Sequence, residues 1–228
     1  MPKVNMPKGT PSLDMTPLVD LAFLLVTFFM LTASFRQAEP VQVTPPSSIS
    51  TEEMPKFNFA TSIDADGRVF IDIQPSPLRG AVFMGVAKKL GYKVSQEDSI
   101  KFVGAGPFGL TFKPLLQYIN ASTTERESIV QNGIPYDTTG KGTQLTVWVQ
   151  EARIVSQNIV NQEAAEAEAK KKPYDKNERY IKFSIKADGR AKYDKVKQII
   201  DVYRGARVKI FQMVTQSEEA PNINLRDF

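Results

Sequence analysis

One acid, Asp20, stands near the start of an apolar run and is the residue of this chain best placed to do chemistry. It follows Asp14-Met15-Thr16-Pro17-Leu18-Val19, and no charged residue occurs from Leu21 to Phe35. The stretch over residues 17–35 approaches the roughly 20 residues that span a hydrocarbon core at about 1.5 Å per residue. A carboxyl in a membrane helix is costly and marks a functional site. We therefore expect a transmembrane helix over residues 17–35 with Asp20 as its functional group.

Two hydroxyls accompany this acid along the predicted helix. Thr27 follows Asp20 by seven residues and Thr16 precedes it by four, so both lie on the same helical face. Either hydroxyl could line a path for a proton that passes Asp20. The alternative for each threonine is a bond to a backbone carbonyl of its own helix, which is common in membrane helices. The sequence leaves both readings open.

The residues before Asp20 define the helix start. Pro17 suits the first helical turn, where a missing N–H removes no intrahelical bond. Asp14 is predicted to cap this helix in preference to relaying protons.

The charges on either side of the run predict its orientation. Lys3 and Lys8 precede it and Arg36 follows it, which favours a cytoplasmic tail over residues 1–16 and places the bulk of the chain outside. A cleaved signal peptide is the alternative, with small residues near Ala33. The acid and Pro17, at a boundary that should be basic, favour a single-pass anchor instead.

Composition narrows the class of protein. The 228 residues include no cysteine and no histidine, which removes the commonest nucleophile, general base and soft metal ligands. We expect neither an enzyme nor a cofactor or metal site, but a binding or energy-coupling protein. The net charge of +4 is spread along the chain and does not indicate nucleic acid. Lys170-Lys171-Lys172 is read as a solvated helix end, with contact to peptidoglycan or anionic lipid as the alternative.

Outside the predicted membrane segment, the pattern indicates a small α+β domain over residues 56–228, preceded by a proline- and serine-rich linker over residues 36–55. Alternating apolar residues and an Asp-Ala-Asp-Gly turn predict a hairpin over residues 56–73. Later segments predict a strand over 180–186, a helix over 193–204 ending at Gly205, and a strand over 208–213. We expect a mixed α/β domain with one sheet and helices on one face.

A largely helical insertion is predicted between these halves, at about residues 79–178. Helices are expected over 80–90, 112–119 and 144–169, the last with a core-facing part that includes Leu145, Trp148 and Ile154 and a solvated Ala/Glu part. Trp148 and Phe108 are predicted to be core residues. The glycine-rich stretch over 104–109 lacks the context of a nucleotide loop and is read as a turn.

The run from Asp14 to Leu25, DMTPLVDLAFLL, resembles the signature of the ExbD/TolR family. In that family a short cytoplasmic tail, a Thr-Pro pair and a membrane acid open a single helix. A second stretch, Ile185–Gly189 with the segments after it to Ile210, is similar to the family's periplasmic strand, helix and closing strand. The Asn-Leu-Pro that often closes the post-membrane segment is missing, and the insertion marks a long member.

The resemblance implies that Asp20 is the proton-carrying carboxylate of an inner-membrane motor. It further implies an ExbB/TolQ-like membrane partner, a homodimer within that complex, and a TonB-like protein that the complex energises for outer-membrane transport. The bulk of the chain is then periplasmic. A TolR-like or motility-type stator bound to peptidoglycan is one alternative. A membrane-anchored periplasmic adaptor without energy coupling is another.

Overall fold

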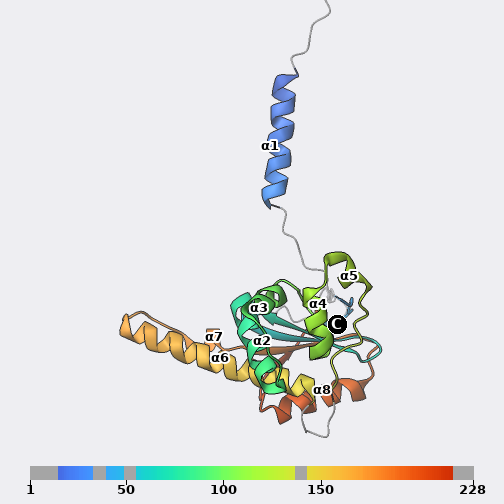
Figure 1. Cartoon of the computed structure of the whole chain (residues 1–228), viewed down its shortest axis with the longest axis vertical. Helices are drawn as coiled ribbons and strands as arrows, with labels where there is room; N and C mark the ends of the chain where they lie inside the picture. The colour runs from blue at the N-terminus through green and yellow to red at the C-terminus, as the bar shows by residue number, and fades with distance from the viewer. Residues whose placement is uncertain (1–14, 33–39, 49–54, 137–142, 218–228) are drawn as a thin grey trace, which may run out of the picture. The chain divides into compact units, whose positions relative to one another are not determined.

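The chain forms two compact units, residues 1–36 and 37–228. A computed structural model describes residues 15–32, 40–48, 55–136 and 143–217. The described part of the first unit is one helix, α1 (Thr16–Thr32) (Figure 1). It begins one residue before the predicted start, and residues 33–35 of the predicted span lie outside the described ranges. None of the helices within those ranges combines the length and the apolar character required to cross a membrane.

The second unit contains a four-stranded mixed sheet in the order β3-β2-β4-β5. Strand β2 pairs antiparallel with β3 and parallel with β4, and β4 pairs parallel with β5. The predicted hairpin and the predicted strand over 180–186 are confirmed. The last strand begins three residues later than predicted, because Val208 is buried in the connection that precedes it. The strands are β2 (Asn58–Ile63), β3 (Val69–Gln74), β4 (Lys182–Ala187) and β5 (Phe211–Met213).

The hairpin turn is fixed by one acid. Asp64 Oδ1 accepts hydrogen bonds from the backbone N–H groups of Asp66 and Arg68 at 3.0 and 2.7 Å. Gly67 adopts φ +82°, a left-handed conformation that favours glycine. The predicted Asp-Ala-Asp-Gly turn is therefore confirmed, with Asp64 supplying the side chain that holds it.

The described residues between β3 and β4 form six helices, and the predicted helical insertion is confirmed. The three helices predicted over 80–90, 112–119 and 144–169 are present, the first beginning four residues earlier. Two of the unpredicted helices begin with a capping box, at Ser95 with Asp98 and at Ser122 with Glu125, and that pattern could have revealed them. The helices are α2 (Ser76–Leu90), α3 (Gln96–Val103), α4 (Phe112–Asn120), α5 (Thr123–Ser128), α6 (Gln144–Ala169) and α7 (Lys176–Arg179).

An aromatic cluster forms the centre of the core. Trp148 of α6 lies 5.8 Å from Phe102 and 5.1 Å from Phe108, measured between ring centroids, and 6.1 Å from Phe112. All four side chains are fully buried. The prediction that Trp148 and Phe108 are core residues is confirmed. Helices and the sheet therefore share one hydrophobic core.

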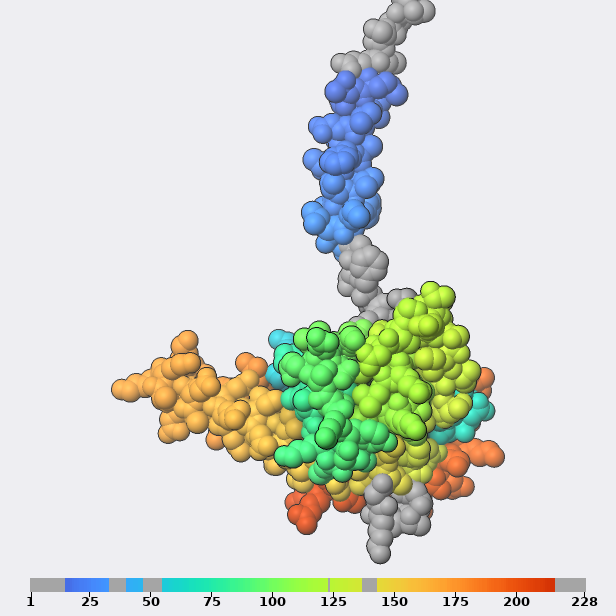
Figure 2. Space-filling view, in the orientation of Figure 1, coloured from blue at the N-terminus to red at the C-terminus, as the bar shows by residue number. Residues whose placement is uncertain are grey.

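The first half of helix α6 packs in the core and its second half is exposed to solvent. Its buried positions end at Val160, and the Ala/Glu-rich second half projects from the rest of the domain (Figure 2). The predicted division into a core-facing and a solvated part is confirmed. Ile154 was expected in the core but is 36% exposed, because Val149 and Ala152 occupy the buried face at this level.

Helix α8 (Tyr193–Gly205) connects β4 to β5 and confirms the predicted helix. Gly205 is its last residue, and Ala206 takes the C-cap position that was predicted for the glycine. Tyr193, expected on the apolar face, is 75% exposed because it opens the first turn, where the helix has not yet reached the core.

The strap, residues 40–48, is the first described segment of the second unit. It contains β1 (Ser47–Ser48), which pairs parallel with β6 (Gln216–Ser217) in a separate two-stranded sheet. Val43 is 7% exposed. This part of the expected linker is therefore docked on the domain.

Candidate functional site

Asp20 is the only ionisable residue within α1. It lies exposed on the second turn of that helix. Thr16 lies one turn before it and Thr27 about two turns after it, so the helix places the three polar side chains along one face, as the sequence predicted. A single carboxyl on an apolar helix can bind and release a proton, or it can make a polar contact with a partner.

Thr27 makes the local bond that was the alternative to a proton path. Its Oγ1 donates to the Leu24 carbonyl oxygen at 2.9 Å. The hydroxyl proton is thereby committed to the helix backbone, although the oxygen retains lone pairs that can accept a hydrogen bond. While this bond is present, the Thr27 hydroxyl can accept a hydrogen bond from a group on a proton path but cannot donate one to it.

Pro17 is the second residue of α1, and its expected role at the helix start stays a prediction. Val19 N donates to the Met15 carbonyl oxygen at 3.0 Å near the start of the helix. Pro17 lies within the turn that this bond closes, where a proline is tolerated because the first N–H groups of a helix have no partner within it. Asp14 lies outside the described residues, so its capping role stays a prediction.

The surface of α1 is largely apolar outside the face that carries Asp20. Its large hydrophobic side chains are between 55% exposed, at Leu18, and 87% exposed, at Leu31. None of the side chains of this helix is buried within the part of the chain that the structure describes. Helices that are apolar all round are found buried in protein or in lipid, so this surface requires a covering.

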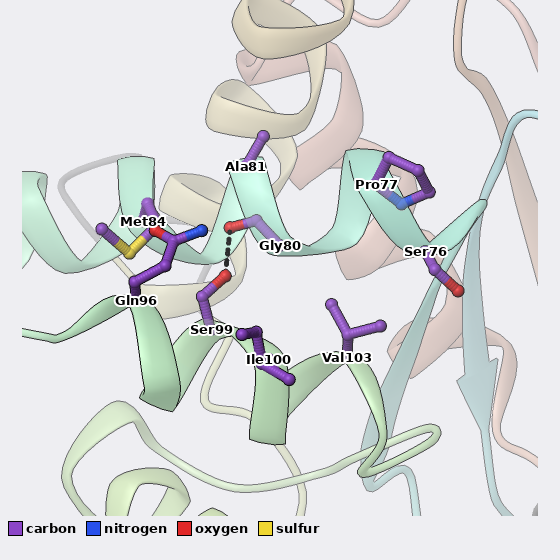
Figure 3. A pocket seen from close by; sticks show the side chains of 9 residues that line it. All are labelled: Ser76, Pro77, Gly80, Ala81, Met84, Gln96, Ser99, Ile100 and Val103. Atoms are coloured by element: carbon purple, nitrogen blue, oxygen red, sulfur yellow. Dashed lines mark hydrogen bonds between the residues drawn. The ribbon is translucent and has the colours of Figure 1, made fainter.

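The domain contributes an open groove between α2 and α3, which the sequence did not predict because α3 itself was missed. Gly80 lets the two helices approach, and Ser99 Oγ donates to the Gly80 carbonyl oxygen at 3.4 Å (Figure 3). Met84, Ile100 and Val103 contribute apolar groups. The groove has a volume of about 450 Å³ and no ionisable residue lines it, so it can bind an apolar group but offers no acid or base.

Two buried acids lie at the ends of the neighbouring strands β2 and β4. Asp64 and Asp188 are each 4% exposed, and Asp188 N donates to the Ile63 carbonyl oxygen at 2.8 Å. The side chain of Arg190 lowers the pKa of Asp188 to about 2, assisted by the backbone N–H groups of Arg190 and Thr44. Asp188 is therefore a structural carboxylate that stays ionised.

A buried ion pair lies at the edge of the sheet. Arg79 is 2% exposed, and its Nη1 donates to Asp72 Oδ1 at 2.8 Å. Burial lowers the pKa of Arg79, and the neighbouring Asp72 opposes this shift. The guanidinium also lies 4.8 Å from the centroid of the Phe102 ring. This arrangement anchors α2 to β3, while Nε and Nη2 of Arg79 are buried with no hydrogen-bond partner among the described residues.

Clusters of three or more acidic, histidine or cysteine side chains that could hold a metal do not occur within the described ranges. The buried acids of the domain have structural roles and its groove carries no ionisable group. Asp20 is therefore the candidate functional residue. The domain offers surfaces for binding.

Comparison with known proteins gives one match. The family model described as "Biopolymer transport protein ExbD/TolR" matches residues 6–100, which include α1, the strap, the hairpin and α2. The second stretch of resemblance, over residues 185–210, lies beyond this match. No curated protein and no solved structure matches the chain. Over residues 6–100, the chain is therefore similar to the ExbD/TolR family of biopolymer transport proteins.

Proposed function

We propose that this chain is the ExbD-like subunit of an inner-membrane complex that converts the proton-motive force into work for transport across the outer membrane. The observation that carries the proposal is Asp20, one carboxyl on a helix whose other side chains are all uncharged. The family match includes this helix and identifies transport of biopolymers as the process served. The proposed role is not enzymatic.

The proposed mechanism follows from the cost of a charge in an apolar medium. When α1 is surrounded by lipid and partner helices, the neutral carboxyl is favoured and the carboxylate requires a compensating polar group. Proton binding and release at Asp20 would therefore change which neighbours the helix prefers, and so bias it between two positions. Moving one charge through the membrane potential supplies about 2.3 kcal/mol per 100 mV.

The exposed surface of α1 supports the proposed partners. An ExbB/TolQ-like membrane protein and the α1 helix of a second copy would cover the exposed apolar side chains of α1. In this arrangement α1 spans the membrane once, with residues 1–16 in the cytoplasm and the domain in the periplasm. The domain then transmits the motion of α1 to a TonB-like protein.

The experiment that tests the proposal is Asp20→Asn in cells that depend on this protein for gradient-driven uptake. We expect uptake and proton conduction by the complex to be lost while protein abundance, measured by immunoblot, stays normal. Asp20→Glu retains a titratable group displaced by one methylene and should retain part of the activity.

Asp194→Asn is the matched control, because it makes the same chemical change on an exposed helix position of the domain. It should leave uptake unchanged. Full uptake in Asp20→Asn cells would contradict the proposal, and would identify the chain as an adaptor in which Asp20 makes only a polar contact.

A further inference from the structure

The strap is attached to the domain by its backbone as well as by its side chains. Thr44 N donates to Asp188 Oδ2 at 3.1 Å, and Thr44 O accepts a hydrogen bond from Gly189 N at 2.9 Å. Val43 and Pro45, on either side of Thr44, are buried. One residue of the strap is thus bound through both of its backbone groups to the turn after β4.

Asp188 divides its two oxygens between the strap and its own turn. Oδ1 accepts hydrogen bonds from Arg190 N at 3.0 Å and from Arg190 Nε at 3.1 Å, while Oδ2 accepts the bond from Thr44. The turn therefore has other bonds that hold it, including Ala191 N to the Asp188 carbonyl oxygen at 2.9 Å. The strap has only this one side-chain acceptor among the bonds described for it.

The second attachment of the strap is short. Ser47 and Ser48 pair with Gln216 and Ser217, and these four residues form a sheet that is separate from the main one. A ladder of two strands with no third strand beside it is marginally stable in water. The strap can therefore leave the domain without breaking the four-stranded sheet or its core.

We propose that the strap is a releasable latch, held closed on the domain by the Asp188 carboxylate, and that its release lengthens the tether between α1 and the domain. With the strap docked, seven residues, 33–39, connect α1 to it. With the strap released, the 25 residues 33–57 precede β2. The eighteen additional residues add about 60 Å of extended chain at about 3.3 Å each.

The position of the strap suits such a role. It is the first described part of the domain that is reached along the chain from α1, so any pull that α1 exerts on the domain acts on the strap before it acts on the sheet. A latch at this place would hold the domain on a short tether until force or competition for Thr44 opens it.

The test uses cysteine labelling in the full chain, which has no cysteine of its own. Val43→Cys places a thiol at a buried strap position, and Gln42→Cys places one at an exposed strap position. In the full-length protein reconstituted in lipid, we expect maleimide to label Gln42→Cys at once and Val43→Cys slowly, at the rate at which the strap opens. Equal rates at the two positions would overturn the proposal, because the strap would not then be docked.

Asp188→Asn, added to Val43→Cys, tests the acceptor. Loss of a charge-assisted bond should raise the labelling rate of Val43→Cys about tenfold. Asp64→Asn is the matched control, since Asp64 has the same burial and bonds its own turn in the same way but makes no described bond to the strap. An unchanged rate in Asp188→Asn, or an equal rise in Asp64→Asn, would contradict a latch held by Asp188.

Amide hydrogen exchange of the unsubstituted protein gives a second measurement. The strap should exchange more slowly than an unprotected chain and faster than the β2–β3 hairpin. If the strap amides exchanged as slowly as those of the hairpin, the strap would open only when the domain unfolds. That result would overturn the proposal. Both measurements report on the strap alone, so they stand whether or not Asp20 carries protons.

Discussion

Helix α1 and the domain use the same residue type in opposite ways. Asp20 lies exposed on a helix that has no buried residue among those described. Asp188 is 4% exposed and accepts three hydrogen bonds within the domain. The comparison teaches that fixed hydrogen-bond donors keep a buried carboxyl ionised and give it a structural role, as at Asp188.

The same contrast applies to apolar side chains. Those of α1 are mostly exposed, whereas the aromatic cluster around Trp148 is closed to water. Substitutions in α1 should therefore affect activity without changing the stability of the domain. Substitutions in the domain should affect stability first, and activity through the amount of folded protein.

Trp148→Ala is expected to have the largest effect on stability. It empties the centre of the aromatic cluster and should lower the free energy of unfolding by about 3–5 kcal/mol. The measurement is urea denaturation of the full chain followed by far-UV circular dichroism, because Trp148 is the only tryptophan.

Trp148→Phe is the control for this substitution. The indole Nε1 is buried with no hydrogen-bond partner among the described residues, so phenylalanine removes an unsatisfied donor and keeps an aromatic ring. Trp148→Phe should lower the free energy of unfolding by clearly less than Trp148→Ala does. If both variants lowered the free energy of unfolding equally, the aromatic ring at position 148 would contribute little to the stability of the domain.

Gly109→Ala is expected to have an intermediate effect. A Cβ at Gly109 would lie 2.3 Å from Cδ1 of the buried Phe70 ring, and relieving this overlap should cost about 1–3 kcal/mol. Gly205→Ala is the matched control, since its Cβ would meet nothing within 4 Å and the residue is helical. That change should stabilise the domain by up to about 1 kcal/mol. Loss of stability in both variants would contradict the packing at Gly109.

The smallest expected effect is the pH dependence of the stabilisation that the Asp188 carboxylate gives the domain. The pKa of Asp188 in the folded protein is lowered to about 2, mainly by hydrogen bonds from Arg190 and to a smaller extent by the bond from Thr44, below the value of about 3.9 expected in the unfolded chain. The stabilisation is therefore complete above about pH 4 and is lost as the pH falls towards 2.

Urea denaturation at several pH values checks this prediction. The difference in stability between the wild-type protein and Asp188→Asn should narrow as the pH falls from 5 to 2. A difference that stays constant over this range would mean that the bonds to the carboxylate do not contribute.

Local patterns were sufficient to predict much of the fold. The hairpin followed from alternation and its turn residues, and α6 was predicted over residues 144–169, as observed, because a long periodic segment leaves little ambiguity. The short helices α3 and α5 were missed, since few residues carry their periodicity and only their capping boxes reveal them. The groove between α2 and α3 was missed for the same reason.

The strap shows where composition misleads. Prolines and serines with no apolar periodicity are typical of a linker, but Val43 and Pro45 pack on the domain and Thr44 bonds to a residue 144 positions away. No local signal reports such a contact. The partner of a short extended segment is decided by the surface that the rest of the chain builds.

The sequence by itself determined the candidate site, because a lone acid in an apolar helix is unusual whatever surrounds it. It also determined the hairpin, the long helix and the resemblance to a family, all of which depend on neighbouring residues. Only the tertiary structure decided that β4 lies parallel beside β2, that Asp188 rather than its neighbours holds the strap, and that an open groove separates α2 from α3. These features arise between segments distant in sequence, where the free energy depends on packing and hydrogen bonding in three dimensions.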